Sequence, residues 1–370
     1  MAAADLASKI RGATVRGLLG LPHPLLRLLA GRPVCIDGQR LDVEVQMVLR
    51  LLALAGEEPL ERLTPERARV RVRNDAQTFE GPKIEVARVE PITVSGADGP
   101  LGGRLYVPPQ TAGGLSGSDA ASGLLVFFHG GGFVVGDLES HDNVCRFLSR
   151  NAGIRVLAVD YRLAPEHRFP AAIDDALAAF RFTLEHAAEL GAAADRIAVG
   201  GDSAGGNLAA GVARLTAAAG EPAPAFQLLF YPWVDLSRKR RSYQLFGDGF
   251  YLTESDLEWD KQHYVASPSD ALDPRCSPAL ADDLAGVTPA YVVTAGFDPL
   301  RDEGEEYGAR LHAAGARVVV RRHPGLIHGF VNTSQMGHSA REALLEAAGA
   351  LRFALSSAAP VAIAPAETAR

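Results

Sequence analysis

Short apolar runs alternate with longer amphipathic segments through most of the chain after residue 83. The runs that are typical of buried strands cover residues 84–94, 103–107, 124–128, 156–161, 197–200, 226–231, 290–295 and 318–322. Alternation of strands and helices at this spacing predicts a mostly parallel sheet covered by helices. We therefore expect an α/β fold built on a mostly parallel, eight-stranded sheet that is flanked by helices.

Before residue 83 the pattern is helical. Residues 41–55 carry the strongest helical periodicity, and Thr64-Pro65 is typical of a helix start. Two further amphipathic helices are expected at residues 3–19 and 25–31. We thus predict an N-terminal helical segment over residues 1–82, an α/β domain over residues 83–356, and a disordered Ala/Pro-rich tail over residues 357–370.

The turn after the run 197–200 carries Gly201-Asp-Ser-Ala-Gly205 and precedes an alanine-rich helical segment. In a strand–turn–helix context this is the G-x-S-x-G pattern that lifts a nucleophilic serine, here Ser203, clear of a sheet. The flanking glycines tolerate the strained backbone of such a turn. The motif also recurs by chance in a chain with 38 glycines, and a serine that only caps the helix is the simple alternative. Further motifs in the right order favour the nucleophile.

The run 124–128 ends in His129-Gly-Gly-Gly132. Adjacent glycines let backbone N–H groups approach a ligand atom closely, as an oxyanion beside Ser203 would require. The N–H of Ala204, directly after the nucleophile, is the expected second donor. A phosphate-binding loop is disfavoured because neither G-x-x-x-x-G-K-[ST] nor G-x-G-x-x-G occurs here. We expect His129 to brace the loop.

In this order of motifs an acid and then a histidine should follow the serine. Asp298 and Asp302 both follow the run 290–295. Asp302 precedes a helical segment and is interpreted as its N-cap. Asp298 lies just past the strand end, where open α/β sheets place functional groups, and we select it as the acid.

The base must come from the histidines beyond Asp298. His312 and His338 lie on predicted helices and are expected to be solvated, whereas His323 is expected to end the strand 318–322. Spacing alone does not separate His323 from His328, but the glycine-flanked loop position favours His328.

Together these motifs resemble the hormone-sensitive-lipase-like family of bacterial esterases. The resemblance rests on His129-Gly-Gly-Gly, Gly201-Asp-Ser-Ala-Gly-Gly, Asp298-Pro-Leu and His328-Gly-Phe, and it extends over roughly residues 85–355. It implies an α/β-hydrolase fold and His328 as the base. It also implies oxyanion donors at the backbone of Gly131, Gly132 and Ala204, with Ser203 and Asp298 completing the triad. The Ala/Arg-rich composition further resembles actinobacterial lipase/esterase members.

The stretch 233–285 is polar, irregular and much longer than a usual connection between elements. With the N-terminal helices it is predicted to form a helical cap over Ser203. Its aromatic residues either form a small core of their own, which we favour, or line the substrate site. The basic run 238–241 is interpreted as a solvated loop rather than as a site for an acidic partner.

Composition and cysteine spacing argue against several classes of protein. A net charge of −7 with mixed signs gives no reason to expect nucleic acid. The cysteines Cys35, Cys145 and Cys276 are odd in number and widely spaced, which favours a reduced, cytoplasmic protein without a zinc site. Charge and proline interrupt every apolar run near the N-terminus, which argues against a secretory signal. Weak contact of the N-terminal helices with a membrane surface, and a homodimer, are compatible with the sequence.

We therefore predict a serine carboxylesterase that hydrolyses short- to medium-chain carboxylic esters through an acyl-enzyme, with a small-molecule ester as its substrate and no cofactor or metal. Two alternatives remain. An amidase or another acyl-transfer enzyme would use the same triad, because fold does not fix the substrate. A non-catalytic small-molecule receptor of this fold is disfavoured because Ser203, Asp298 and His328 are all present.

Overall fold

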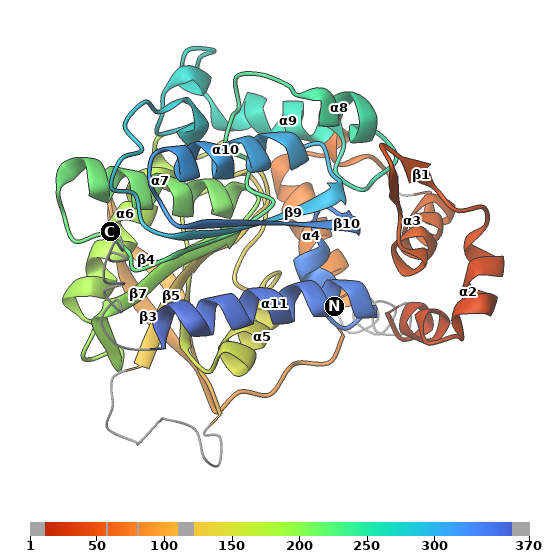
Figure 1. Ribbon diagram of the computed structural model, residues 1–370, viewed down its shortest axis with the longest axis horizontal. Coiled ribbons are helices and arrows are strands. Elements are labelled where there is room, and N and C mark those ends of the chain that lie inside the picture. Colours follow the sequence, from red (N-terminus) through yellow and green to blue (C-terminus); the bar gives the residue numbers. More distant parts are fainter. Residues whose placement is uncertain (1–11, 57, 80, 110–121, 357–370) are drawn as a thin grey trace, which may run out of the picture.

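The computed structural model describes residues 12–56, 58–79, 81–109 and 122–356. Its centre is an eight-stranded sheet with the strand order β10-β9-β8-β7-β5-β6-β4-β3 (Figure 1). Strand β4 pairs antiparallel with both β3 and β6, and every other pairing is parallel. The predicted α/β-hydrolase architecture with a mostly parallel sheet is confirmed.

The strands fall where the apolar runs predicted them. They are β3 (Arg88–Gly96), β4 (Gly99–Val107), β5 (Ser122–Phe128), β6 (Arg155–Asp160), β7 (Ala192–Asp202), β8 (Gln227–Phe230), β9 (Ala290–Phe297) and β10 (Val318–Ile327). The last strand is longer than expected. His323 does not end it, because pairing with β9 resumes at Ile327 after a register shift.

Helices cover both faces of the sheet and bury a separate apolar cluster on each (Figure 1). One face carries α6 (Ala171–Glu185), α7 (Ala204–Ala219) and α10 (Arg301–Ala313), and the other carries α5 (Asp142–Ala152) and α11 (His338–Leu355). Because both faces are covered, the central strands are almost continuously apolar, as Leu124 to Phe128 of β5 illustrate.

The N-terminal part is helical, apart from a short hairpin that the sequence did not predict. Residues 12–19 are helical, and α2 (His23–Ala30), the hairpin β1 (Cys35–Ile36) and β2 (Gln39–Arg40), α3 (Val43–Ala55), η1 (Leu60–Arg62) and α4 (Pro65–Phe79) follow. The expected helix at 3–19 lies partly, and the expected C-terminal tail wholly, outside the described residues. Within the described residues no helix combines the length and apolarity that a membrane crossing requires.

The long stretch after β8 forms α8 (Arg241–Phe246), α9 (Glu254–Tyr264), η2 (Asp270–Leu272) and η3 (Pro278–Leu280). Its aromatic side chains do not make a core of their own, contrary to the favoured interpretation. Phe246 packs against Phe297 at the end of β9, with ring centroids 5.3 Å apart, and Tyr264 stacks on Phe133 at 3.9 Å. This stretch is therefore packed onto the end of the sheet at which the predicted site residues lie.

The basic run 238–241 is engaged within the chain itself. Arg240 is paired with Asp235, Lys239 contacts Glu254 on α9, and Arg241 reaches Asp37 in the hairpin between β1 and β2. The run ends at the start of α8. Its ion pairs connect this part of the chain to α9 and to the hairpin between β1 and β2 in the N-terminal part.

Candidate active site

Ser203 occupies the turn between β7 and α7. Its φ of 53° and ψ of −118° are strained for a residue with a side chain, and its side chain is largely buried. The glycines on either side are needed for packing, since a Cβ on Gly201 or Gly205 would overlap the backbone carbonyl of Phe128. This turn has the geometry of a nucleophile elbow.

Asp298 and His328 come together at the carboxyl ends of β9 and β10. Asp298 is fully buried, and its Oδ2 lies 2.8 Å from Nδ1 of His328. Because a carboxylate only accepts hydrogen bonds, Nδ1 carries the proton and Nε2 is left as the basic atom of the ring. No hydrogen bond of the described residues joins Ser203 to His328. Such bonds often tighten only around a substrate.

The ring of His328 is held from a second side by Tyr231, which follows β8. The two ring centroids are 4.3 Å apart, and Tyr231 is itself fully buried. Packing by Tyr231 and the hydrogen bond to Asp298 together restrict the orientation of the imidazole. The sequence carried no signal for this contact.

Asp302 does not have the N-cap role that the sequence predicted, and Asp298 makes a local hydrogen bond of its own. Asp302 is not the N-cap of α10, because Leu300 holds that position without a side-chain cap and Asp302 lies in the first turn. Its carboxylate instead accepts a hydrogen bond from the N–H of Ser242, at 2.8 Å. Asp298 does have a local role, since its Oδ1 accepts from the N–H of Leu300 at 2.8 Å.

The other histidines lie apart from this pair. His323 is on β10, where its Nε2 faces Glu346 of α11 at 3.9 Å. His312 and His338 are exposed on α10 and α11, as predicted.

The glycine loop after β5 is bound to the elbow through Asp202. The N–H of Gly130 donates to Oδ1 of Asp202 at 2.9 Å. Gly131 and Gly132 follow with φ of +118° and +58°, and a Cβ on Gly131 would overlap the carbonyl of Val135. No hydrogen bond to a described residue uses the backbone N–H of Gly131, Gly132 or Ala204. These three N–H groups are therefore available to donate hydrogen bonds to a substrate oxygen.

His129 braces this loop, as expected. Its Nδ1 lies 2.8 Å from the carbonyl of Gly130, to which it donates, and its ring stacks on Tyr161 at 4.4 Å. Burial, reinforced by the neighbouring His141, lowers the pKa of His129 to about 4. The ring is therefore neutral at neutral pH.

A buried ion pair that the sequence analysis missed lies behind the elbow. Nε2 of His141 is 3.2 Å from Oδ1 of Asp202, and Nδ1 of His141 is 2.9 Å from Oγ of Ser140. Burial opposes the charge on both groups, but their attraction prevails, so the pKa of His141 is raised and that of Asp202 is lowered. The only signal of this pair in the sequence was the aspartate inside the G-x-S-x-G motif, Asp202.

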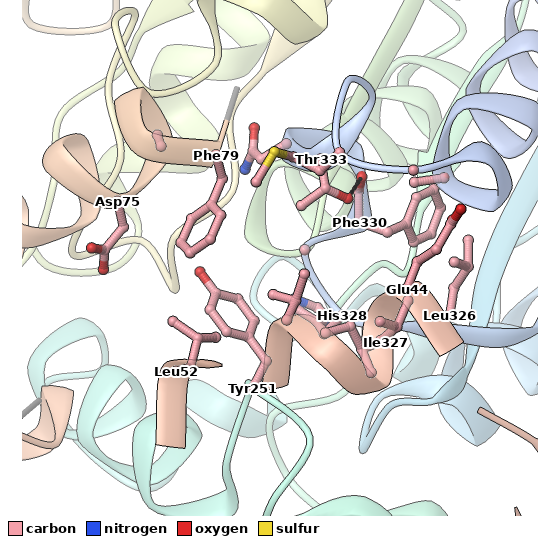
Figure 2. Close-up of a pocket in the computed structure, with 18 of the residues that line it drawn as sticks. Glu44, Leu52, Asp75, Phe79, Tyr251, Leu326, Ile327, His328, Phe330 and Thr333 are labelled. Atoms are coloured by element: carbon pink, nitrogen blue, oxygen red, sulfur yellow. Dashed lines mark hydrogen bonds between the residues drawn. The ribbon is translucent and has the colours of Figure 1, made fainter. Parts of the chain in front are cut away.

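A cleft opens beside His328. Its walls come from α3, α4, η4 (Phe330–Thr333) and the loop before α9, and they are mostly apolar. Figure 2 shows Tyr251 between Leu52, Phe79 and His328. Tyr251 has a φ of +77° and is 51% exposed, which places a strained and accessible aromatic ring at the mouth of the site.

Among the described residues no cluster of histidine, cysteine, aspartate and glutamate side chains is suited to holding a metal ion. The three cysteines are free thiols, and Cys145 and Cys276 are buried.

Comparisons with known proteins agree with the fold. Residues 125–332 match the model of a family described as alpha/beta hydrolase fold. The chain is 45% identical over 352 residues to the carboxylic ester hydrolase LipN of Mycobacterium tuberculosis, covering 92% of this chain and 91% of that protein. It is 40% identical to an ethyl acetate hydrolase of Pseudomonas putida, covering 80% and 92%. The solved structure of an ester hydrolase from the metagenome of Lake Arreo superposes with a TM-score of 0.79 at 40% identity, covering 85% and 98%.

Proposed function

Because this chain belongs to the hormone-sensitive-lipase-like family of α/β hydrolases and is a carboxylic ester hydrolase, we propose that Ser203, His328 and Asp298 are its catalytic triad. The observation that supports this most is the 2.8 Å hydrogen bond between Asp298 and His328, from the ends of neighbouring strands. It leaves Nε2 as the basic nitrogen of the imidazole, and the proposal assigns this atom to the proton of Ser203.

In the proposed reaction, Oγ of Ser203 attacks the ester carbonyl carbon while Nε2 of His328 takes the hydroxyl proton. Asp298 holds the neutral ring in the required tautomer and stabilises the imidazolium that forms. Collapse of the tetrahedral intermediate breaks the bond to the alcohol oxygen, which receives the proton from Nε2. Water then attacks the acyl-enzyme by the same route and releases the carboxylic acid and Ser203.

The oxyanion of each tetrahedral intermediate is proposed to accept hydrogen bonds from the N–H groups of Gly131, Gly132 and Ala204. Their unused donors and the left-handed backbone at both glycines support this assignment. One such donor typically contributes a factor of roughly 10²–10³ to kcat.

The substrate is proposed to lie with its alcohol part in the cleft beside His328. His328 must protonate the leaving oxygen, so the alcohol has to be on the side of its ring. The mostly apolar cleft lies there, between α3, α4 and Tyr251. The acyl part then points past the glycine loop toward α9. We propose that residues 1–82 and 233–285 act together as the cap over this site, and that short- to medium-chain acyl groups are preferred.

Substitution of the triad tests the proposal. Ser203→Ala and His328→Ala should each lower kcat for p-nitrophenyl butanoate by on the order of 10⁴-fold, and the double variant should lose little more, because the groups act as a unit. Asp298→Asn should be comparably or somewhat less severe.

The competing residues supply matched controls for the triad. His323→Ala and Asp302→Asn should keep kcat within a few-fold of the parent enzyme. Loss of activity in His323→Ala with activity retained in His328→Ala would show that the base has been assigned to the wrong histidine.

A further inference from the structure

A buried carboxyl group without a partner lies on the inner face of α9. Asp260 is only 5% exposed, and its Oδ1 is buried with no hydrogen-bond partner. Among the described residues no hydrogen bond or ion pair involves either of its carboxyl oxygens. An unsatisfied buried polar group is costly, so a ligand group that hydrogen-bonds to it would be stabilised there.

The carboxyl group lies directly against the glycine loop. A Cβ on Gly132 would overlap both carboxyl oxygens of Asp260, so the acid fills the space that a side chain at position 132 would need. One helical turn after Asp260, Tyr264 stacks on Phe133 at 3.9 Å. This face of α9 therefore covers the loop that carries two of the proposed oxyanion donors, on the acyl side of Ser203.

The surroundings hold Asp260 in its neutral form. Burial, and then the charge of Asp256 one turn earlier on α9, raise its pKa well above the ordinary value. Tyr161, after β6, is the other titratable group that it faces, and it too is fully buried and neutral. A neutral carboxyl group offers one O–H donor and one carbonyl acceptor, and both are unused here.

A hydroxyl group is the ligand that fits this pair of atoms. It can accept from the acid's O–H or donate to the acid's carbonyl, and it brings no charge into a site beside a developing oxyanion. An alkyl chain would leave the acid unsatisfied once water is displaced, which disfavours it. We propose that Asp260 is a specificity residue that hydrogen-bonds a hydroxyl substituent on the acyl group, so that hydroxyacyl esters are preferred substrates. This inference rests on the proposed function, since it needs the acyl group to lie beside the glycine loop.

The test compares p-nitrophenyl butanoate with each enantiomer of p-nitrophenyl 3-hydroxybutanoate, so that the leaving group is constant. We expect kcat/KM of the parent enzyme to be higher for one hydroxy enantiomer than for butanoate. Asp260→Leu, which keeps the approximate size without the polar atoms, should lower that ratio by about tenfold to a hundredfold. Asp260→Asn, which keeps a donor and an acceptor, should retain most of the parent enzyme's preference for the hydroxy ester.

Asp256→Asn is the matched control. Asp256 is a second carboxyl group on the same face of α9, but Thr253 already engages it in a capping box. The ratio of kcat/KM for the hydroxy ester to that for butanoate should stay near that of the parent enzyme, since burial, the larger cause of the raised pKa of Asp260, is unchanged in this variant.

Four outcomes would overturn the inference. An unchanged ratio in Asp260→Leu, with butanoate still hydrolysed, would remove Asp260 from specificity and leave the proposed function standing. Should Asp260→Leu fail to fold, a parent enzyme that prefers neither hydroxy enantiomer over butanoate would be equally decisive. Preference for the 3-aminobutanoyl ester, lost in Asp260→Asn, would show that the site takes a cation instead. Failure of the parent enzyme on every ester would overturn the proposed function and this inference with it.

Discussion

At the scale of single residues, backbone strain is concentrated around the candidate site. The non-glycine residues with positive φ in the described chain are Asp37, Phe133, Ser203, Tyr231 and Tyr251. All but Asp37 lie at the site: Phe133 ends the glycine loop, Ser203 is the proposed nucleophile, Tyr231 packs on His328, and Tyr251 stands in the cleft. Each such residue costs roughly 1–3 kcal/mol, which the surrounding packing must offset.

His129 makes stability depend on pH. Its pKa is about 4 in the folded protein and about 6.5 in an unfolded chain, so the unfolded state binds the proton first as the pH falls. Its contribution is therefore present above pH ~6.5 and is lost as the pH falls toward 4, by at most about 3 kcal/mol.

We expect His129→Asn to show a smaller loss of unfolding free energy between pH 7 and pH 5 than the parent protein, measured by urea denaturation. His312→Asn, at an exposed position on α10, should show the parent's dependence. Identical pH slopes for His129→Asn and the parent would mean that His129 is not held neutral in the fold.

At the scale of elements, the loops of the site are tied to the ends of the strands by hydrogen bonds and an ion pair. These loops therefore cannot move independently of the sheet. Asp202 at the end of β7 holds Gly130 of the glycine loop and His141 at the start of α5. The glycine loop and the start of α5 are thus joined to the distant end of β7 beside Ser203. Such cross-links keep donors and nucleophile in a fixed relation, which preorganised electrostatic catalysis requires.

The Asp202–His141 pair should show strong coupling. Removing one partner of a buried ion pair typically costs about 3–5 kcal/mol, because the other charge is left uncompensated. Asp202→Asn and His141→Gln should each destabilise the protein by an amount of that order in urea denaturation, with losses in the double variant well short of additive. The kcat of Asp202→Asn should fall as the loop loosens. Additive losses would argue that the two side chains do not interact energetically.

At the scale of the whole molecule, distant parts of the chain build one cleft. Its walls come from the N-terminal helices α3 and α4, from the loop before α9, and from the segment between His328 and α11. The exposed leucines of α2, at positions 25, 28 and 29, take no part in it. Of the described N-terminal residues, those that line the cleft therefore lie on α3 and α4.

Filling this cleft should change the alcohol preference. Each CH₂ buried there favours binding by roughly 0.8 kcal/mol, so kcat/KM should rise from ethyl to hexyl acetate. Leu52→Trp should remove most of that rise and leave ethyl acetate little affected. Leu54→Trp, on the same helix but 75% exposed, is the control and should behave as the parent enzyme. Equal losses on both esters in Leu52→Trp would contradict the assignment of the cleft to the alcohol.

The sequence by itself determined the fold class, the order of the strands along the chain, and the Ser203 and glycine-loop motifs. These depend on local periodicity and on contiguous residues whose backbone demands are met within a few positions. It left His323 and His328 unresolved by spacing, assigned Asp302 a cap that Leu300 holds, and ended β10 too early. Its only sign of the Asp202–His141 pair was the aspartate inside the G-x-S-x-G motif, and it carried no sign of Tyr231 on His328 or of Asp260 against Gly132. Those features were decided by tertiary structure alone, because each joins residues brought together only when separate strands and helices pack, and the burial that sets their charges exists only in the folded chain.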